Sequence, residues 1–480
     1  MRSSFFFAII LHEVAMEYNH STFISPLTWR YGSEEMKHIF SEEHKRKLLR
    51  RVWIALARAE SKAGLVTKAQ VEELEAHKDE IDIDRATEIE NTIHHDLMAE
   101  IKTYAEQCPL SGGIIHLGAT SMDALDNADA VRFKEALTLI IQKLDALIAA
   151  LADKAEEYKD TATMAFTHIQ PAEITTIGYR LAQTLQDLME DRKECQDVLS
   201  SIRGKGMKGA VGTGASYSVL LSGTGISAEE LETMVMDELG IKAFTAATQT
   251  YTRKQDLRII ASLSSIAATL HKAALDFRVL QSPPIGEFSE PFGKKQVGSS
   301  AMPFKRNPIN SEKICSLSRI VESQYQAAWM NASLSILERT LDDSANRRIF
   351  MPEAFIATDE MLMTELKIVK GMNIHSTATE RLMNDYGIFA STERLLMELG
   401  RRGADRQEMH EVIREESLSA WKSVQEGKGN PLKENLMKDE RILQYLPESE
   451  IEKLLDAHDY TGDAARRTSY VIAEARKLIQ

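Results

Sequence analysis

The chain has 480 residues, more than one hydrophobic core usually serves, so we expect two or three domains. Its composition, 43% hydrophobic and 27% charged, is typical of an ordinary soluble globular protein and excludes bulk disorder. The formal net charge of −14 argues against a nucleic-acid-binding surface, which is normally basic. An acidic protein can still hold a locally cationic pocket, so an anionic small-molecule substrate is not excluded.

Residues 1–24 are predicted to be an N-terminal extension. The apolar run from Phe5 to Leu11 faintly resembles a signal peptide, but it is short, and His12 and Glu13 follow it without an obvious cleavage site. No later stretch approaches the roughly 20 apolar residues of a membrane span. The three cysteines are far apart and odd in number, which fits neither a disulfide framework nor a CxxC metal site: Cys108, Cys195 and Cys315. We therefore expect a cytoplasmic protein without a membrane partner.

Proline positions and apolar periodicity predict long helices. No proline occurs between Pro109 and Pro171 or between Pro171 and Pro283, so both intervals are free to hold them. Apolar residues recur at steps of three and four in runs at 136–155, 174–199, 257–280 and from 308 to 320. Strand-like alternation is scarce. The sequence predicts an all-α protein, with a central long-helix bundle at 121–373 between smaller helical domains at 25–120 and 374–480.

Three polar segments interrupt the helical pattern. Residues 204–218 are rich in glycine, residues 283–308 carry most of the prolines of the middle of the chain, and residues 338–348 are densely charged. Long irregular segments in a helical scaffold are usual places for binding and catalysis. We therefore expect functional side chains there.

The most specific motif is GSSAMPFKRNP at residues 298–308. It resembles the signature loop G-S-x-x-M-x-x-K-x-N of the fumarase/aspartase superfamily, whose members remove a proton next to a carboxylate and expel an amine or hydroxyl from the neighbouring carbon. The resemblance implies that Ser299 is the general base and that Lys305 and Asn307 hold the substrate carboxylate. A serine hydroxyl is a poor base unless backbone amides and cations such as Lys305 stabilise its alkoxide. The alternative is a plain surface loop, which a pattern with this many fixed positions disfavours.

A second segment, THIQPA at residues 167–172, resembles the T-H-x-Q-x-A segment of the same superfamily. The resemblance implies that His168 is the general acid. Histidine suits that role because its unperturbed pKa lies near neutrality. Taken alone, a histidine before a proline is more often a structural residue at a helix entry.

Two further segments precede the bundle. HHDLMA at residues 94–99 resembles a segment in which His95 contacts the substrate and orients the acid, and Asp96 shares the pocket. His94 stands where a basic residue is usual. GGIIHLGATS at residues 112–121 resembles a segment in which Thr120 and Ser121 bind a substrate carboxylate. The alternatives are a solvated helix face for the first segment and a turn with an N-cap for the second; adjacent residues on a helix make a poor metal site.

Three other stretches resemble the adenylosuccinate lyases in particular: QTYTRK at 249–254, ERTLDDSANRR at 338–348, and SPL at 25–27 followed by RY. This resemblance covers residues from about 25 to 460. It implies that the AMP moiety is bound by Arg30, Tyr31, Arg339, Ser344 and Arg348. Gln249 would contact the succinyl end, and Lys313 replaces a usual arginine. Arginine binds phosphate bidentately and stays charged. The alternative for Arg339 and Arg348 is a salt-bridge network with Asp342 and Asp343.

The resemblance implies a three-domain, all-α homotetramer in which each active site draws segments from three subunits. It also implies release of fumarate from adenylosuccinate, giving AMP, and from the succinylated aminoimidazole carboxamide ribotide (SAICAR, giving AICAR) of purine biosynthesis, with no metal and no cofactor. The alternatives are an argininosuccinate lyase and a non-catalytic structural relative, such as a lens-crystallin-like protein. Ser299, His168, Lys305 and His95 all stand in place, which disfavours the latter. The apolar runs that begin at Leu137, Leu181 and Leu263 fit burial between subunits and equally a monomer's own core.

Overall fold

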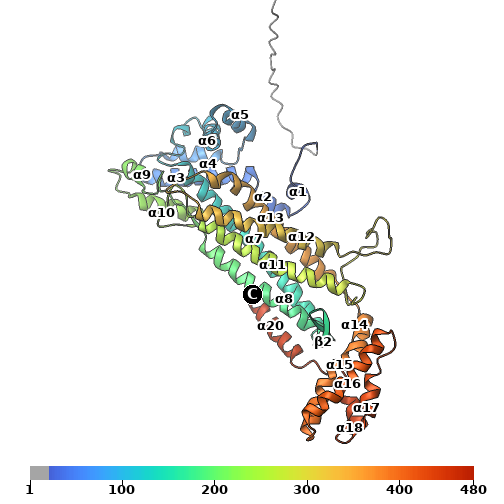
Figure 1. Cartoon of the computed structure of the whole chain (residues 1–480). Coiled ribbons are helices and arrows are strands. Elements are labelled where there is room, and N and C mark those ends of the chain that lie inside the picture. The colour runs from blue at the N-terminus through green and yellow to red at the C-terminus, as the bar shows by residue number, and fades with distance from the viewer. Residues whose placement is uncertain (1–20) are drawn as a thin grey trace, which may run out of the picture. The chain divides into compact units, whose positions relative to one another are not determined.

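The computed structural model describes residues 21–480, which are mostly helical (Figure 1). The predicted extension therefore lies, up to residue 20, outside the described residues. The longest helices of the described chain are α7 (Ser121–Glu157), α8 (Ile177–Ser201), α11 (Lys254–Gln281), α12 (Ile309–Ser333) and α13 (Asp342–Gly371). The all-α class predicted from periodicity and proline spacing is confirmed.

One predicted helical run begins later than expected. Residues 174–176 belong not to a helix but to strand β2 (Gln170–Thr176), which pairs antiparallel with β1 (Ala162–Thr167). Ile174 and the two threonines that follow it are β-branched, and such residues favour a pleated strand over a helix. Helix α8 starts directly after them, so the apolar run spans a strand and a helix.

The chain divides into two compact units, each described here by itself. Unit 1 contains residues 21–139, 199–260 and 324–357, and unit 2 contains residues 140–198, 261–323 and 358–480. The division into three domains with boundaries near 120 and 373 remains a prediction.

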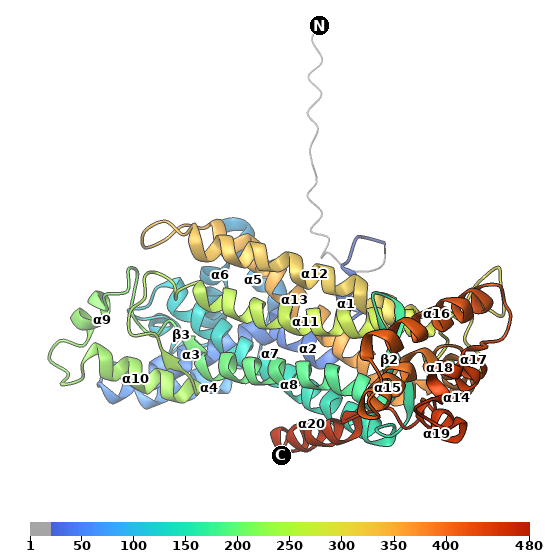
Figure 2. The ribbon, with the colours of Figure 1, turned by 60° about the horizontal axis from the view of Figure 1, so that its bottom comes forward.

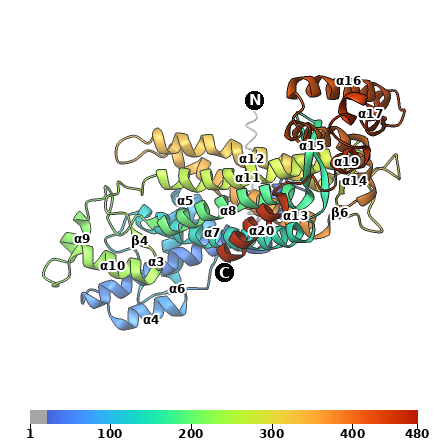
Figure 3. The same ribbon diagram turned by 90° about the horizontal axis from the view of Figure 1, so that it is seen from below.

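Unit 1 is organised around α3 (Glu42–Lys62), whose buried face includes Trp53 and Leu56. Helix α3 packs against α10 (Ala228–Leu239) and α4 (Lys68–Ala76), as Figure 3 shows. Both partners start with a capping box, from Ser227 and Thr67 respectively, which satisfies free amides of the first turn. The other short elements of this unit are α1 (Pro26–Trp29), α2 (Glu34–Ile39), α5 (Ile83–Ile93), α6 (Asp96–Gln107), η1 (Gly112–Ile114), β3 (Arg203–Gly204), α9 (Ala215–Leu220) and β4 (Lys242–Ala243).

Unit 2 contains the β1–β2 hairpin and the C-terminal helices, of which those before the last, α20 (Ala464–Leu478), cluster together in Figure 2. Leu399, Leu436 and Ile451 form part of their common core. A short antiparallel pair joins β5 (Phe288–Ser289) to β6 (Asn373–Ile374). The C-terminal elements are α14 (Ser376–Leu382), η2 (Met383–Gly387), α15 (Ile388–Arg401), α16 (Arg406–Gln425), α17 (Leu432–Lys438), α18 (Glu440–Leu443), α19 (Glu448–Leu454) and α20 (Ala464–Leu478).

The predicted apolar runs are largely buried in the single chain. Leu137 and Leu263 are completely buried, and Leu181 is half-buried. Large apolar side chains are exposed elsewhere, at the C-terminal half of α12 and in the segment after it: Tyr325, Trp329, Met330, Leu334, Ile336, Leu337 and Leu341. The sequence left open whether these runs are buried between subunits or in the core of a single chain. The runs around Leu137 and Leu263 are buried in the core of the single chain. No helix within residues 21–480 combines the length and apolar character needed to cross a membrane.

Glu60 of α3 is buried without compensation. Its side chain is 0% exposed, and neither carboxylate oxygen has a hydrogen-bond partner among residues 21–480. Burial raises the pKa of Glu60 from its ordinary 4.5 to about 8. Between these two values the folded state retains a proton that the unfolded state has lost, so the free energy of unfolding falls as the pH rises from 4.5 to 8.

Substitution Glu60→Gln should remove this pH dependence, because the amide is neutral at every pH. We expect the Tm of the variant to match that of the wild type near pH 5 and to exceed it by roughly 3–8 °C at pH 8.5. Thermal unfolding at both pH values measures the difference, with the exposed Glu434→Gln as control. An equal shift at the two pH values would show that the carboxyl does not titrate in this range.

Candidate active site

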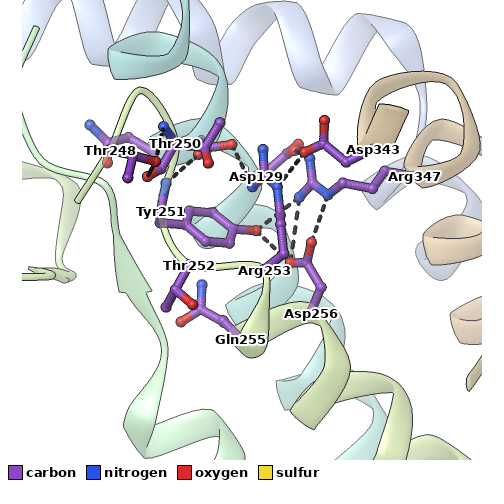
Figure 4. A network of polar contacts seen from close by, with 12 residues as sticks. Asp129, Thr248, Thr250, Tyr251, Thr252, Arg253, Gln255, Asp256, Asp343 and Arg347 are labelled. Atoms are coloured by element: carbon purple, nitrogen blue, oxygen red, sulfur yellow. Dashed lines mark hydrogen bonds and ion pairs between the residues drawn. The ribbon is translucent and has the colours of Figure 1, made fainter. Parts of the chain in front are cut away.

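Arg253 and Arg347 form the centre of a buried ion-pair network in unit 1 (Figure 4). Arg253 immediately precedes α11 and donates from Nη1 to Asp126 of α7 (3.0 Å) and from Nε to Asp343 of α13 (2.5 Å). Burial alone would raise the pKa of Asp343, but Arg253 and Arg339 lower it by more. The network thus connects α7, the start of α11 and the start of α13.

Arg347 lies one turn further along α13. It donates from Nε to Asp256 (2.7 Å), from Nη1 to Asp129 (3.2 Å) and from Nη2 to the hydroxyl of Tyr251 (2.9 Å). Tyr251 in turn donates to Asp256 (2.7 Å), and its backbone amide donates to Asp126 (2.8 Å). Burial raises the pKa of Tyr251 well above its ordinary value, so the phenol remains a donor.

A small pocket of about 110 Å³ lies beside this network. Among its described lining residues, the cations outnumber the carboxylates by six to three. The cations are Lys45, Arg132, Arg253, Arg339, Arg347 and Arg348, and the carboxylates are Glu42, Asp129 and Asp343. Ser344 also lines it. Three residues predicted to bind the nucleotide, Arg339, Ser344 and Arg348, are therefore brought together.

The two predicted phosphate ligands have different partners in the chain. Arg339 donates from Nη1 to Asp343 (2.6 Å), so its expected salt bridge with that residue is confirmed. Arg348 instead donates to Asp96 of α6 (2.8 Å) rather than to Asp342 or Asp343. Burial alone would raise the pKa of Asp96. The backbone amide of Leu97 and the charge of Arg348 lower this pKa by more, so it lies below its ordinary value. The predicted alternative, a salt-bridge network with Asp342 and Asp343, is thus correct for Arg339 and wrong for Arg348.

The buried Nε groups of two arginines that line the pocket are unsatisfied. Neither Arg339 Nε nor Arg132 Nε has a hydrogen-bond partner within residues 21–480. An unpaired buried N–H of a charged group is energetically costly.

The two adjacent histidines lie in the break between α5 and α6, so the alternative of a solvated helix face does not hold for them. His94 ends α5 in the left-handed conformation (φ 55°), and His95 caps α6 by accepting from the amide of Met98 at Nδ1 (3.3 Å). Both side chains are exposed, and Asp96 begins α6 directly after them. A tight reversal of the chain thus presents them to solvent.

Thr120 and Ser121 lie where α7 begins. The turn before α7 bonds the amide of Ala119 to the carbonyl of His116, and the amide of Thr120 donates to Asp123 (3.1 Å). The predicted turn is therefore present. His116 accepts at Nδ1 from Trp53 (3.0 Å), and burial lowers its pKa to about 4. This histidine is neutral near pH 7.

Three other predicted ligands of unit 1 do not line the small pocket: Arg30, Tyr31 and Gln249. Arg30 follows α1 and lies beside the rings of Trp29 and Tyr31. The backbone amide of Gln249 donates to the carbonyl of Glu338 (3.1 Å). This last bond joins the QTYTRK and ERTLDDSANRR segments side by side.

In unit 2, His168 occupies the tip of the β1–β2 hairpin. Thr167 pairs with Gln170, so His168 and Ile169 are the two turn residues, and both have positive φ (54° and 60°). Such a turn favours asparagine and glycine, and a β-branched residue there is strained by about 1–2 kcal/mol. The structure replaces the predicted helix entry with an exposed hairpin turn. Strain of this kind is typical of functional sites.

The signature motif at 298–308 is part of a longer loop, residues 291–308, which lies between β5 and α12 in unit 2. This whole segment is the signature loop of the structure. The hydroxyl oxygen of Ser299 accepts from the amides of Ala301 (3.3 Å) and Met302 (3.1 Å). Asn307 donates to the carbonyl of Gly298 (3.2 Å), and a Cβ on Gly298 would lie 2.1 Å from the carbonyl oxygen of Lys305. Only glycine permits this close approach. The side chain of Lys305 is exposed.

Lys313 lies in the second turn of α12, where its Nζ donates to Glu360 of α13 (2.5 Å). Its charge is therefore already paired within unit 2. Within the described chain, no group of three or more His, Cys, Asp or Glu side chains is placed to hold a metal ion.

The network residues Asp126, Asp129, Arg253, Asp256 and Arg347 were not predicted as part of the site. A sequence signal existed, because Asp123, Asp126 and Asp129 recur at steps of three and so lie on one side of α7. Aligned carboxylates on a buried face require cations, which the nearby arginine-rich segments supply.

Solved structures share this fold over nearly the whole chain. The 3-carboxy-cis,cis-muconate lactonizing enzyme of Pseudomonas putida superposes with a TM-score of 0.82, covering 94% of this chain and 98% of its own at 23% identity. A fumarate lyase of Mesorhizobium sp. BNC1 gives 0.80, with 92% and 98% covered, at 21% identity. The fold is thus that of the fumarase/aspartase-type lyases, as predicted.

Sequence comparison defines the family within this class. A family model described as lyase matches residues 30–322, and one described as adenylosuccinate lyase C-terminus matches residues 389–471. Adenylosuccinate lyase of Saccharomyces cerevisiae is 39% identical over 455 residues, and that of Schizosaccharomyces pombe is 38% identical over 458, each covering 94% of both chains. That of Pyrococcus abyssi is 37% identical, covering 94% of this chain and 97% of its own. The chain belongs to the adenylosuccinate lyase family and is a carbon–nitrogen lyase.

Proposed function

We propose that the protein cleaves adenylosuccinate into AMP and fumarate, and SAICAR into AICAR and fumarate, by β-elimination. Family membership over nearly the whole chain carries this proposal. Each reaction removes a proton from the carbon next to a carboxylate, breaks the neighbouring carbon–nitrogen bond and leaves the proton on the departing nitrogen. It requires a base, a cationic environment for the developing charge, and an acid.

Ser299 is the proposed base. The amides of Ala301 and Met302 already point at its oxygen and would stabilise the alkoxide, since N–H donors are stronger partners for an anion than for a hydroxyl. Lys305 and Asn307 on the same loop would hold the carboxylate that accepts the charge. His168, exposed at the hairpin tip, would protonate the leaving nitrogen.

The small cationic pocket is the proposed site of the substrate phosphate. Arg339, Ser344 and Arg348 line this pocket together with other cationic side chains, and a guanidinium group offers charge-assisted donors to a phosphate. The pocket volume of about 110 Å³ suits a phosphate group rather than a whole nucleotide. Gln249, Thr120 and Ser121 would act at the succinyl end of the substrate, and the other predicted ligands would contact the rest of it: Arg30, Tyr31, His94, His95, Asp96 and Lys313.

A homotetramer with active sites shared between subunits would complete this arrangement. The proposed acid and base belong to unit 2, whereas the cationic pocket belongs to unit 1. The exposed apolar side chains around Trp329 and Leu337 supply a surface that another subunit could cover. The three cysteines are buried and unpaired, which fits the proposed cytoplasmic location.

An ultraviolet assay of the purified protein tests the substrate directly. We expect AMP and fumarate from adenylosuccinate and no product from argininosuccinate, because only the former carries a phosphate for the cationic pocket. Sizing of the same sample establishes that it is assembled. A folded, assembled protein without activity on adenylosuccinate would refute the proposed function, and turnover of argininosuccinate would move the assignment to another lyase.

Replacement Ser299→Ala should lower kcat by about 10³-fold or more, because the base is lost, while KM changes little. The neighbouring Ser300→Ala is the matched control: its side chain is exposed, and we assign it no role. Steady-state kinetics and Tm for both variants make the comparison. Full activity in Ser299→Ala would exclude the proposed base.

Replacement Arg339→Met should raise KM for adenylosuccinate by about 10- to 100-fold with a smaller effect on kcat, because a charge-assisted phosphate contact is lost. Arg339→Lys keeps the charge but loses the two parallel N–H donors of the guanidinium, so its KM should lie between those of the wild type and Arg339→Met. An unchanged KM in folded Arg339→Met would remove the phosphate from this pocket.

A further inference from the structure

Two buried carboxylates flank strand β5 at the entry to the signature loop. Glu287 is 0% exposed and Glu290 is 6% exposed, and the strand residues Phe288 and Ser289 between them pair with β6. Residues 287–290 are called the strap below. The reaction proposed above uses neither carboxylate. Buried carboxylates are costly unless their bonds hold something in place.

Glu287 binds the hairpin that carries His168. It accepts from the hydroxyl of Thr163 on β1 and from Nη1 of Arg180 on α8 (2.8 Å). Nη2 of the same arginine donates to the carbonyl of Met164 on β1 (2.7 Å). Thr163 is itself completely buried. One carboxylate and one guanidinium thus anchor the first strand of the hairpin to α8 and to the strap.

Glu290 closes the base of the signature loop. Its Oε1 accepts from the amide and hydroxyl of Ser311 (both 2.7 Å), and its Oε2 accepts from the amide (3.1 Å) and side chain (2.7 Å) of Asn310. These donors are at the N-terminus of α12, where a negative charge is favourable. The residue that enters the loop is therefore bonded to the first turn of the helix that leaves it.

Gln281, the last residue of α11, makes a second connection across the same loop. Its Oε1 accepts from the amide of Glu290 (2.9 Å), and its Nε2 donates to the carbonyl of Arg306 (3.1 Å). Both limbs of the loop are thus tied to one side chain. Ser299 and Lys305 lie between these ties.

Glu365 of α13 is buried near Glu290 without a hydrogen-bond partner for its Oε2 within residues 21–480. Burial and then the charge of Glu290 raise the pKa of Glu365 to about 8. Near neutral pH the carboxyl of Glu365 therefore retains its proton.

We propose that the strap positions both proposed catalytic segments: Glu290 holds the loop of Ser299, and Glu287 holds the hairpin of His168. The inference rests on the proposed roles of those two residues. Both carboxylates are positioning residues that do not touch the substrate. A displacement of about 1 Å at a reacting group can cost about 100-fold in rate, so the anchoring of an irregular loop is a requirement of the chemistry.

The experiment compares Glu290→Ala, Glu290→Gln and Glu287→Gln in the full-length protein, with the exposed Glu434→Ala as control. Hydrogen exchange without substrate should accelerate in residues 291–309 for the Glu290 variants and in residues 162–176 for Glu287→Gln, each change confined to its own segment. With adenylosuccinate, kcat should fall about 100-fold in Glu290→Ala and about 10-fold in Glu290→Gln, because the amide retains one acceptor for Ser311. Glu434→Ala should change neither measurement.

Exchange that rises equally in both segments for every variant, or kcat within twofold of wild type in folded Glu290→Ala, would overturn the proposal. If Glu290→Ala does not fold, Glu290→Gln decides by the same criteria. Because exchange is measured without substrate, it tests the strap even if the proposed substrate is wrong. If each variant accelerates exchange only in its own segment but the wild-type enzyme is inactive on adenylosuccinate, the proposed function is wrong and the strap is not.

Discussion

The guanidinium of Arg253 lies between Asp126 and Asp343, and the arrangement of unit 1 depends on this contact. Asp126 belongs to α7, Arg253 to the start of α11 and Asp343 to the start of α13, so one side chain joins three elements distant in the sequence. Such buried pairs contribute little net stability compared with a hydrophobic core, but loss of one partner leaves an uncompensated charge and costs about 3–5 kcal/mol. Arg347, with Asp256 and Asp129, repeats this arrangement one turn along α13.

This network also explains how an acidic protein holds a cationic pocket. The chain carries a net charge of −14, yet the described residues that line the pocket include six cations and three carboxylates. The carboxylates orient the arginines and neutralise part of their charge, which allows the arginines to be packed closely. The Nε donors of Arg339 and Arg132 remain unsatisfied. The net charge of the chain therefore does not predict the charge of the pocket, which depends on ion pairs between neighbouring side chains.

The proposed acid and base are carried by irregular backbone, and in each case neighbouring residues restrain it. His168 and Ile169 have positive φ at a hairpin tip, and Gly298 permits a backbone approach that no other residue allows. Conformations of this kind persist only where the surroundings over-determine them. The contacts of Glu287 with β1 and of Glu290 with α12 are restraints of this type. Both lie in a four-residue stretch that lacks any recognisable motif.

Much of this protein could be predicted from the sequence. The helical class was predictable, since the apolar residues of 136–155 and 257–280 recur at steps of three and four and both runs lack proline, and local periodicity is sufficient for that prediction. The family was predictable too, because GSSAMPFKRNP and ERTLDDSANRR resemble its motifs. Apolar periodicity alone was misleading at Ile174 to Thr176, where β-branched residues form a strand, and it did not reveal the helix break at His94 and His95. Three pairings could not be predicted from the sequence: Arg348 with Asp96, Arg253 with both Asp126 and Asp343, and Glu290 with Ser311. The physical reason is that periodicity and motifs depend on neighbours within a few residues, whereas pairing of buried charges depends on which distant segments exclude water together.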